Sequence, residues 1–404
     1  MNAPADAPRT RVVVAWALYD LANTIYSAIV VTTFLPDLLE TRYGASSWLF
    51  YATSATLLAS ALVSTALGAR VDRTGRARPG LDGFTLLCIG ATAALYPCAG
   101  LGPVPLLVLY AISLFGYQAA LTFYNALLPV VAPPHRRGWV SGLGTALGYA
   151  GLPLAFLVGR AVSQGPLGLE GTFLLCAGLF LLGTVPLWLL VKDDPARARA
   201  AAGPRVRLVD SLRWVASQPT LRLLLLANFV AADVMNTLIA HVYLYLKNHV
   251  GLGASRAVDG MVALSMTALV GGLVVGKLVD RLRPARVFAT AAGLLVVALF
   301  ASAAWPRDVV SIVGLVVAGG LGVAATWTVG RQLVIAVAPP ERCGEALGLY
   351  GVTTKASIVG TSLFAMLRDG FGYGTAVLAQ AVALAGAVAL LLAFDRRHAA
   401  EGKR

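Results

Sequence analysis

The feature that most constrains this chain is a series of long apolar stretches along almost its whole length. A helix needs about 20 mainly apolar residues to cross the hydrocarbon core of a bilayer. Backbone groups in lipid must bond internally, so the stretches predict an all-α membrane protein with twelve transmembrane helices. Their approximate bounds are 12–36, 47–69, 81–101, 104–128, 138–160, 171–191, 221–246, 259–279, 286–305, 308–331, 344–367 and 371–394.

The composition agrees with a chain that is covered by lipid. Charged residues make up 13% of it, whereas a soluble domain usually carries about 25%. The first apolar stretch is long and has no small-residue cleavage site, so we expect a retained first span and not a signal peptide. The four cysteines are far apart and form no Cys-x-x-Cys pair. We therefore expect packing roles for them, with no metal site and no disulfide framework.

The net charge of +13 follows a topological pattern. With both termini placed in the cytoplasm, 25 of the 32 lysines and arginines fall in cytoplasmic loops or tails. The positive-inside rule then fixes the orientation in a plasma membrane, the bacterial inner membrane. Because topology accounts for the basic excess, we expect no nucleic-acid partner.

The longest connection follows the sixth span and separates two six-helix halves. Within it, Arg207–Ser217 carries apolar side chains on one face, which is typical of a helix that lies along the membrane surface. The predicted domains are an N-terminal six-helix bundle over 1–191, a cytoplasmic linker over 192–220 and a C-terminal six-helix bundle over 221–404.

Three short segments recur in the two halves, in the same order and at offsets of 208, 206 and 213 residues. Each half has an even number of spans, so the two copies share one orientation. We expect them to be related by an axis along the membrane normal, with a substrate path between them. The matched pairs are Gly68–Arg76 with Gly276–Arg283, Ala132–Gly138 with Ala338–Gly344, and Asp20–Thr24 with Asp233–Thr237.

The first repeated segment, between spans two and three, carries a known type of motif. Gly68-x-x-x-Asp72-Arg73-x-Gly75-Arg76-x-Arg78 resembles the signature loop of the major facilitator superfamily. The resemblance implies the fold of that superfamily, two pseudo-symmetric six-helix bundles, and secondary active transport of a small solute by alternating access.

A finer resemblance, to the Atg22-like family called UMF1 in bacteria, rests on four segments. Eukaryotic members of that family are associated with amino-acid export from vacuoles. The resemblance thus implies export of an amino acid or a related zwitterionic metabolite. This chain departs from the family pattern at Leu21, where Phe is common. The segments are Trp16–Asn23, Val140–Tyr149, Ala232–Thr237 and Gly348–Lys355.

The repeated loop motif predicts a gating contact. Asp72 sits just beyond a helix C-terminus and can interact with the N-terminus of a neighbouring helix, while the arginines can bridge carboxylates. Such contacts break when the halves rock apart, so the loop acts as a latch. Positive-inside charge alone is the alternative, but it leaves the paired glycines and aspartates unexplained. The gating residues are Gly68, Asp72, Arg73, Gly75, Arg76, Gly276, Asp280 and Arg281.

Three ionisable residues fall inside spans, where an ionisable side chain is a functional hypothesis by default. Asp20, Asp233 and Lys355 lie 9, 11 and 11 residues from the cytoplasmic ends of their spans, which is roughly 13–17 Å deep at 1.5 Å per residue. Asn23 and Asn236 follow the aspartates by three residues, on the same helix faces. These five residues predict a central site for substrate binding or proton coupling; the alternative is a permanent structural Asp–Lys bridge.

Further polar and aromatic side chains complete the predicted site. They belong to span four, to its repeat partner span ten, and to the position that aligns with Lys355. Packing is the alternative for the aromatic rings. His241, toward the outer end of span seven, is either a proton relay or an interfacial hydrogen-bonded histidine. The added lining residues are Tyr117, Gln118, Tyr124, Asn125, Tyr149 and Trp327.

The sequence lacks the motifs that mark several classes of protein function. No Gly-Lys-Ser/Thr phosphate loop, no Ser/His/Asp order and no metal-ligand cluster occurs, so we expect neither an enzyme nor a cofactor. The expected partners are a small-molecule substrate, protons and membrane lipid, and the expected state is a monomer. Two alternatives stay open: a transporter of lipids or amphiphiles, and a transport-inactive receptor or assembly factor on the same scaffold.

Overall fold

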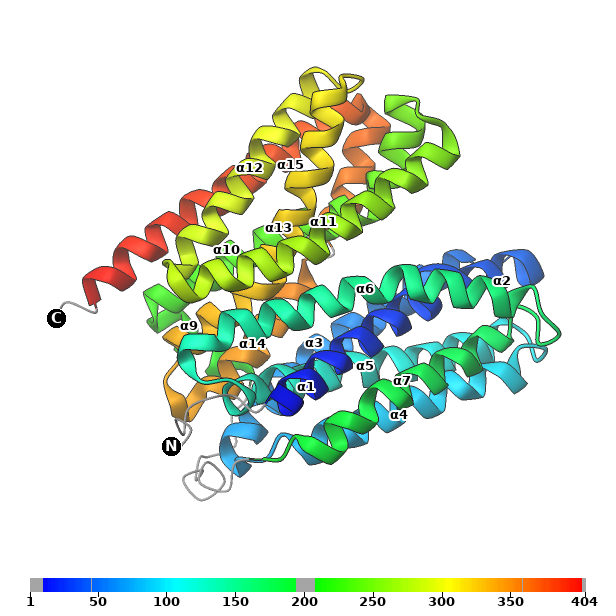
Figure 1. Ribbon diagram of the computed structural model, residues 1–404, viewed down its shortest axis with the longest axis horizontal. Helices are drawn as coiled ribbons and strands as arrows, with labels where there is room; N and C mark the ends of the chain where they lie inside the picture. The colour runs from blue at the N-terminus through cyan, green and yellow to red at the C-terminus, as the bar shows by residue number, and fades with distance from the viewer. Residues whose placement is uncertain (1–9, 45, 194–207, 358, 402–404) are drawn as a thin grey trace. The chain divides into compact units, whose positions relative to one another are not determined.

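The computed structural model describes residues 10–44, 46–193, 208–357 and 359–401, and all regular structure within these ranges is helical (Figure 1). The helices are α1 Thr10–Tyr26, η1 Ser27–Thr33, α2 Phe34–Tyr43, α3 Ser46–Thr74, α4 Arg78–Cys98, α5 Pro103–Val131, η2 Pro134–Arg136, α6 Arg137–Ser163 and α7 Gly171–Leu190. They continue with α9 Leu208–Ser217, α10 Pro219–Leu244, η3 Tyr245–Val250, α11 Gly253–Arg281, α12 Pro284–Ala304, α13 Val309–Val337, η4 Pro340–Arg342, α14 Cys343–Ala356 and α15 Val359–Glu401.

The helices agree with a fold of twelve spans. Eleven stretches of the described chain are long and apolar enough to cross a membrane. The last of them, Pro340–Glu401, is 62 residues long and contains two predicted spans. Gly372, at φ 84°, breaks the helix at the start of the second of those spans, in a conformation that glycine adopts without steric cost. The prediction of an all-α membrane protein with the twelve-helix fold is therefore confirmed.

Some span boundaries differ from the predicted ones. The first span, predicted as 12–36, is helical from Thr10 to Tyr43 through a π-helical turn. The tenth, predicted to end at 331, runs to Val337 as α13. Arg331, which the charge count assigned to a cytoplasmic loop, thus lies inside a helix and is only 5% exposed. The prediction ended the span at the charge, whereas the helix continues because that charge has hydrogen-bond partners within the protein.

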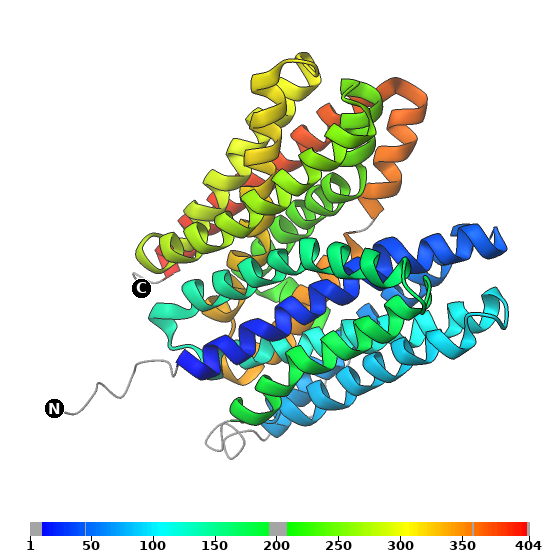
Figure 2. The ribbon, with the colours of Figure 1, turned by 45° about the vertical axis from the view of Figure 1, so that its right-hand side comes forward.

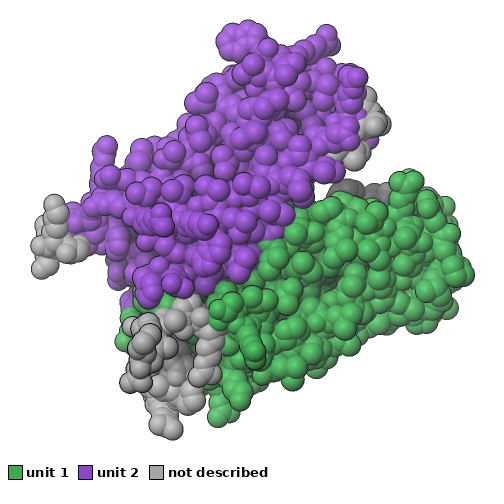
Figure 3. All heavy atoms as spheres, viewed as in Figure 1, with its two compact units in different colours: residues 1–134, 147–208, 340–348 green, residues 135–146, 209–339, 349–404 purple. Residues whose placement is uncertain are grey.

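The chain forms two compact units (Figure 3). Helices α6 and α14 each begin in one unit and end in the other. The start of α6 belongs to unit 2 and the rest to unit 1, whereas the start of α14 belongs to unit 1 and the rest to unit 2. Unit 1 contains residues 1–134, 147–208 and 340–348, and unit 2 contains residues 135–146, 209–339 and 349–404.

Each unit is a bundle of packed helices. In unit 1, α1 packs against α7, and α5 packs against both α3 and α4. In unit 2, α10 packs along α15, α11 packs along α13, and α12 lies against α13 and α15, as Figures 1 and 2 show. Glycine permits close helix contact in unit 2: a Cβ placed on Gly320 of α13 would come within 2.7 Å of the backbone nitrogen of Ala268 in α11.

A cluster of aromatic side chains fixes α1 against α5 inside unit 1. The rings of Trp16 and Tyr19 stack on Tyr124, with centroids 4.4 and 5.1 Å apart, and Tyr26 lies 4.9 Å from Tyr117. The hydroxyl groups of Tyr19 and Tyr26 each share a hydrogen bond with a hydroxyl of another helix, at 2.6 and 2.8 Å. A buried phenol needs such a partner, and the hydroxyls of Tyr19 and Tyr26 have one.

The linker is described in its second part. Its predicted helix is present as α9, while its position at a membrane surface stays a prediction, and residues 194–207 lie outside the described residues. The four cysteines are outside any disulfide in the described part of the chain: Cys88, Cys176 and Cys343 are buried and Cys98 is partly buried.

Candidate functional site

The eleventh span consists of two helices, and an aspartate binds the start of the second. Helix α14 ends at Ala356 and α15 begins at Val359. The carboxylate of Asp233, from α10, accepts a hydrogen bond from the backbone nitrogen of Gly360 at 2.8 Å. The first N–H groups of a helix lack partners and carry partial positive charge, which suits a carboxylate. Any side chain at Gly360 would overlap this carboxylate.

Lys355 lies at the end of the preceding helix. It occupies the last turn of α14, where the partial negative charge of the helix C-terminus favours a cation. Its side chain is only 7% exposed. The two helix ends of the eleventh span are thus associated with one carboxylate, from Asp233, and one ammonium, from Lys355.

Two asparagines of α10 add polar contacts along the same helices. The amide nitrogen of Asn228 donates to the Thr353 hydroxyl at 3.1 Å, and that of Asn236 donates to the Ser357 hydroxyl at 3.0 Å. The sequence analysis included Asn236 but missed Asn228, although an asparagine within an apolar run was a usable signal. Together with Asp233, these side chains make α10 the polar partner of α14 and α15 in unit 2.

The repeat-related position in unit 1 is built differently. The span that corresponds to α14 and α15 is α6, which is continuous through Pro153. Asp20 of α1 is partly buried, and its backbone carbonyl accepts from the Thr24 hydroxyl at 3.0 Å. Asn23 is 2% exposed, and both polar atoms of its side chain lack a hydrogen-bond partner in the described ranges. The two aspartates therefore have different surroundings despite their equivalence in the repeat.

The other predicted lining residues divide between the units. Tyr124 is fully buried in the aromatic cluster, and Trp327 of α13 is partly exposed in unit 2. Their role as lining residues stays a prediction. The remaining four, all partly exposed and in unit 1, are Tyr117, Gln118, Asn125 and Tyr149.

The loop motif of the first half holds the start of α14. The carboxylate of Asp72, near the end of α3, accepts from the backbone nitrogens of Gly344 at 2.6 Å and Glu345 at 2.7 Å. One turn earlier, Gly68 lies so close that a Cβ there would overlap the carbonyl of Gly344. Gly75, at φ 62°, ends α3 in the left-handed conformation. The expected contact between carboxylate and helix N-terminus is present, and its action as a latch stays a prediction.

The loop motif of the second half repeats the contact in unit 2. Asp280, near the end of α11, accepts from the backbone nitrogens of Gly138 at 2.9 Å and Trp139 at 2.8 Å, in the first turn of α6. A Cβ on Gly276 would stand 2.8 Å from the Gly138 carbonyl oxygen. The paired glycines thus permit the backbone approach that brings each aspartate to its helix start.

A buried arginine that the sequence analysis did not single out supports the same part of α6. The guanidinium of Arg331 donates to the side-chain oxygen of Ser141 at 2.6 Å and to its carbonyl at 2.9 Å. The repeat offset aligns Arg331 with Asn125, a residue that was noticed, so the signal was present. The first turns of α6 are therefore held by Asp280 and by Arg331.

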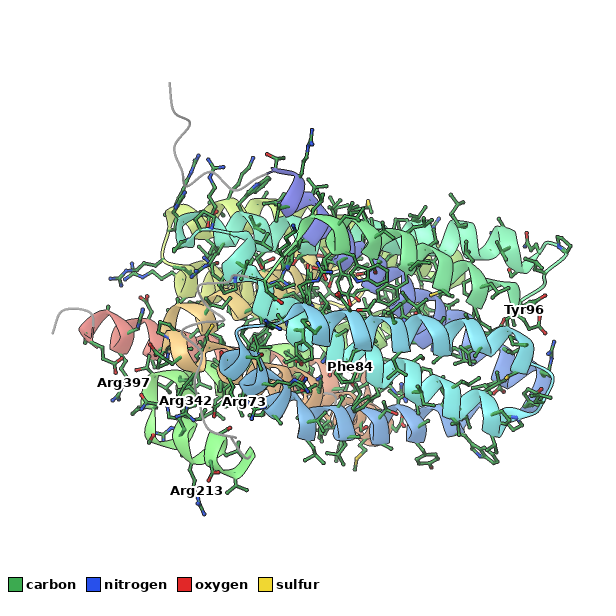
Figure 4. All side chains as sticks on the ribbon, turned by 90° about the horizontal axis from the view of Figure 1, so that it is seen from below. Arg73, Phe84, Tyr96, Arg213, Arg342 and Arg397 are labelled. Carbon is green, nitrogen blue, oxygen red and sulfur yellow. The ribbon has the colours of Figure 1, made fainter. Side chains whose placement is uncertain are left out.

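The arginines of the loop motif divide by role. Arg78 donates to the Leu187 carbonyl at the end of α7, at 2.8 Å, and pairs with Asp82 at 3.0 Å. It thus strengthens unit 1 itself. Arg76 and Arg281 are exposed, and Arg73 is partly buried. Figure 4 shows Arg73 at the same end of unit 1 as Arg342, which binds the buried Glu345 carboxylate at 2.7 and 2.8 Å.

Comparison with known proteins gives one family and several relatives. A family profile described as the Major Facilitator Superfamily matches residues 12–355 and, again, residues 224–404. An uncharacterised protein of Aquifex aeolicus strain VF5 is 27% identical over 353 residues, 85% of each chain. An uncharacterised MFS-type transporter of Bacillus subtilis strain 168, YxiO, is 24% identical over 408 residues, 94% of each chain. The crystal structure of the human organic anion transporter MFSD10 superposes with a TM-score of 0.76 at 17% identity, covering 96% of this chain and 100% of that one.

Proposed function

Because this chain belongs to the major facilitator superfamily, it is an integral membrane protein and a secondary transporter of a solute, and we propose that the solute is a small zwitterion of the amino-acid type. We place the protein in the bacterial inner membrane with both termini in the cytoplasm. Within the superfamily we assign it to the Atg22-like, or UMF1, group on its motifs Trp16–Asn23 and Gly348–Lys355. Export is the direction that this assignment favours.

The observation that carries the proposal is the pair of opposite charges at the interrupted eleventh span. A zwitterion presents an ammonium and a carboxylate a few atoms apart. Asp233 supplies the partner for the ammonium, and Lys355 supplies the partner for the carboxylate. Charge-assisted hydrogen bonds of this kind are about twice as strong as neutral ones. The amides of Asn228 and Asn236 add polar contacts on the same helix.

Proton coupling follows from the charge balance of this site. While the ammonium of the solute engages the Asp233 carboxylate, that cation keeps the carboxylate charged. A carboxylate that loses a nearby cation holds a proton more readily. Solute release from Asp233 and proton uptake at Asp233 are thereby linked, with Asp72 and Asp280 as latches of the conformational cycle.

The proposal is tested by a thermal-shift screen of the purified protein against amino acids, peptides, nucleosides and lipids. A ligand that binds only the folded state raises its stability by RT ln(1 + [L]/Kd). We expect at least one amino acid to raise the unfolding temperature of the wild type. Lys355→Ala should abolish that rise, while Lys247→Ala, at an exposed lysine of η3, should retain it. Stabilisation by lipids alone would favour the amphiphile transporter and reject the zwitterion.

A further inference from the structure

Helix α9, which precedes the seventh span, leaves a strip of apolar side chains exposed. Val209 is 55% exposed, Leu212 is 51% exposed, and Ala216 is exposed as well. With 3.6 residues per turn, these three side chains lie on one face of the helix, and we call them the α9 strip. Single exposed apolar side chains are ordinary on a protein surface, whereas a continuous strip indicates a surface that another molecule covers.

The other sides of α9 are either buried or polar. Ser211 is fully buried, and Trp214 and Val215 are partly buried, so one side of the helix faces the protein. Asp210 and Ser217 are exposed on a further side, away from the α9 strip. A helix with an apolar side and a separate polar side is typical of the boundary between membrane and water.

The chain holds α9 beside a membrane span. Gln218, at φ −107° and ψ 88°, separates α9 from α10, whose residues Pro219–Tyr243 are long and apolar enough to cross a membrane. The guanidinium of Arg222, near the start of α10, donates to the Ala216 carbonyl at 3.2 Å and so ties the two helices together. A helix tied this close to the start of a span borders the lipid headgroups.

The charge of this segment suits an anionic lipid surface. Between residues 192 and 222 the sequence has seven lysines and arginines and three aspartates. Basic residues beside the cytoplasmic end of a span attract anionic headgroups. The side chain of Arg213, at the edge of the α9 strip, is 79% exposed, and Figure 4 shows it pointing away from the helices. Its exposed pairing with Asp210, at 3.9 Å, contributes little, so Arg213 can bind a phosphate.

We propose that α9 docks on the cytoplasmic leaflet, with the α9 strip among the acyl chains and Arg213 bound to the phosphate of an anionic phospholipid. A second copy of the chain or a soluble protein would also cover an apolar strip. The excess of basic residues and the position beside a span favour lipid over both. This docking requires the cytoplasmic placement of α9 that is proposed above, and it is independent of the solute.

The test measures which solvent surrounds each side of α9. Single cysteines are spin-labelled in the full chain, in a background without the native cysteines, and the protein is placed in nanodiscs that contain phosphatidylglycerol. Oxygen concentrates in lipid and a soluble nickel chelate stays in water. Labels on the α9 strip should be relaxed by oxygen and protected from nickel, and the control labels should show the reverse. The strip variants are Val209→Cys, Leu212→Cys and Ala216→Cys, and the controls are Asp210→Cys and Ser217→Cys.

Two results of this experiment would overturn the proposal. Access of nickel to the α9 strip equal to that at the control positions would show that the strip faces water. Protection of the strip from both oxygen and nickel would show that protein covers it. Neither result involves solute, transport or the side of the membrane on which α9 lies, so either would leave the proposed function standing.

The role of Arg213 is tested by changing the lipid charge. Replacing phosphatidylcholine with phosphatidylglycerol should reduce the access of nickel to a label at position 212, and high salt should weaken this response. Arg213→Gln should lose the response. Arg396→Gln, at an exposed arginine of α15, is the matched control and should keep it. An equal response in the two variants would remove Arg213 from the docking and overturn the proposed phosphate contact.

Discussion

At the scale of single residues, Gly360 determines whether Asp233 can hold the start of α15. A methyl group at Gly360 would overlap the Asp233 carboxylate, so Gly360→Ala should break the 2.8 Å hydrogen bond. We expect a lower unfolding temperature and loss of the amino-acid thermal shift. Gly370→Ala, on the same side of the break at Gly372 and with open space around its Cβ position, should keep both. Equal behaviour of the two variants would show that this contact is dispensable.

Asp233 and Lys355 are either a binding site or a structural bridge, and a double-mutant cycle separates the two. Removing one member of a buried ion pair costs about 3–5 kcal/mol, because the other charge is stranded. If the pair is a bridge, Asp233→Asn with Lys355→Ala should regain the stability that each single variant loses. We expect the double variant to be folded and without solute binding. Solute binding at wild-type strength in the double variant would reject the site.

The sequence identifies charged residues of the site better than their contacts. Asp233 and Lys355 stand out because an ion in an apolar run is costly and hence conspicuous. The bond to Gly360 is invisible to hydropathy, since residues 344–367 form one apolar stretch although the helix is interrupted there. Arg331 was missed for the opposite reason: it lies near a predicted span end, where charge is ordinary, and its contact with Ser141 is not visible in the hydropathy.

At the scale of helices, the two loop motifs hold the first turns of α14 and α6. A carboxylate at a helix N-terminus contributes about 1 kcal/mol. Asp72→Asn should weaken the hold on α14 and shift the balance of inward-open and outward-open states while the protein stays folded. A pair of spin-labelled cysteines at positions 44 and 251 reports that balance as a distance distribution.

Asp37→Asn, at an exposed aspartate of α2, is the matched control for the latch and should leave the distribution unchanged. An Asp72→Asn distribution identical to that of the control would remove the latch from the mechanism.

The internal repeat predicts these helix contacts but not their differences. The spacing of glycine and aspartate predicted that both motifs bind the start of a helix. Asp72 and Asp280 make these contacts. The repeat also implied equivalent surroundings for Asp20 and Asp233. The structure differs because α6 continues through Pro153, whereas its counterpart is interrupted after Ala356. Pattern matching detects shared residues, and a helix break depends on packing that the pattern does not contain.

At the scale of the whole molecule, the orientation in the membrane is open to direct test. Single cysteines at positions 44 and 251 should react with an impermeant thiol reagent added outside the cell, in a background without the four native cysteines. Cysteines at 75, 203 and 284 should react only after permeabilisation, because the positive-inside rule places these loops in the cytoplasm. Labelling of position 203 from outside would reject the division into two six-helix halves.

Fold class and family follow from the sequence alone, because apolar length and loop motifs are local properties. The extent of the compact units does not. Residues 135–146 and 340–348 cluster with the unit of the other sequence half, because the loop-motif aspartates and glycines draw those helix starts toward them. The unit to which each of these helix starts belongs depends on tertiary contacts between residues some 140 or 270 positions apart in the sequence. Local sequence patterns do not contain such contacts.

The central claim is that this secondary transporter carries a zwitterion through Asp233 and Lys355. The most direct measurement is uptake of labelled amino acids into proteoliposomes, as exchange without a gradient and as accumulation under an imposed pH gradient. Wild-type protein should do both. Asp233→Asn keeps an oxygen that accepts from the ammonium but cannot take up a proton, so it should keep exchange and lose accumulation, and Lys355→Ala should lose both. Absence of exchange of every amino acid by the wild type, or wild-type exchange by Lys355→Ala, would contradict the account.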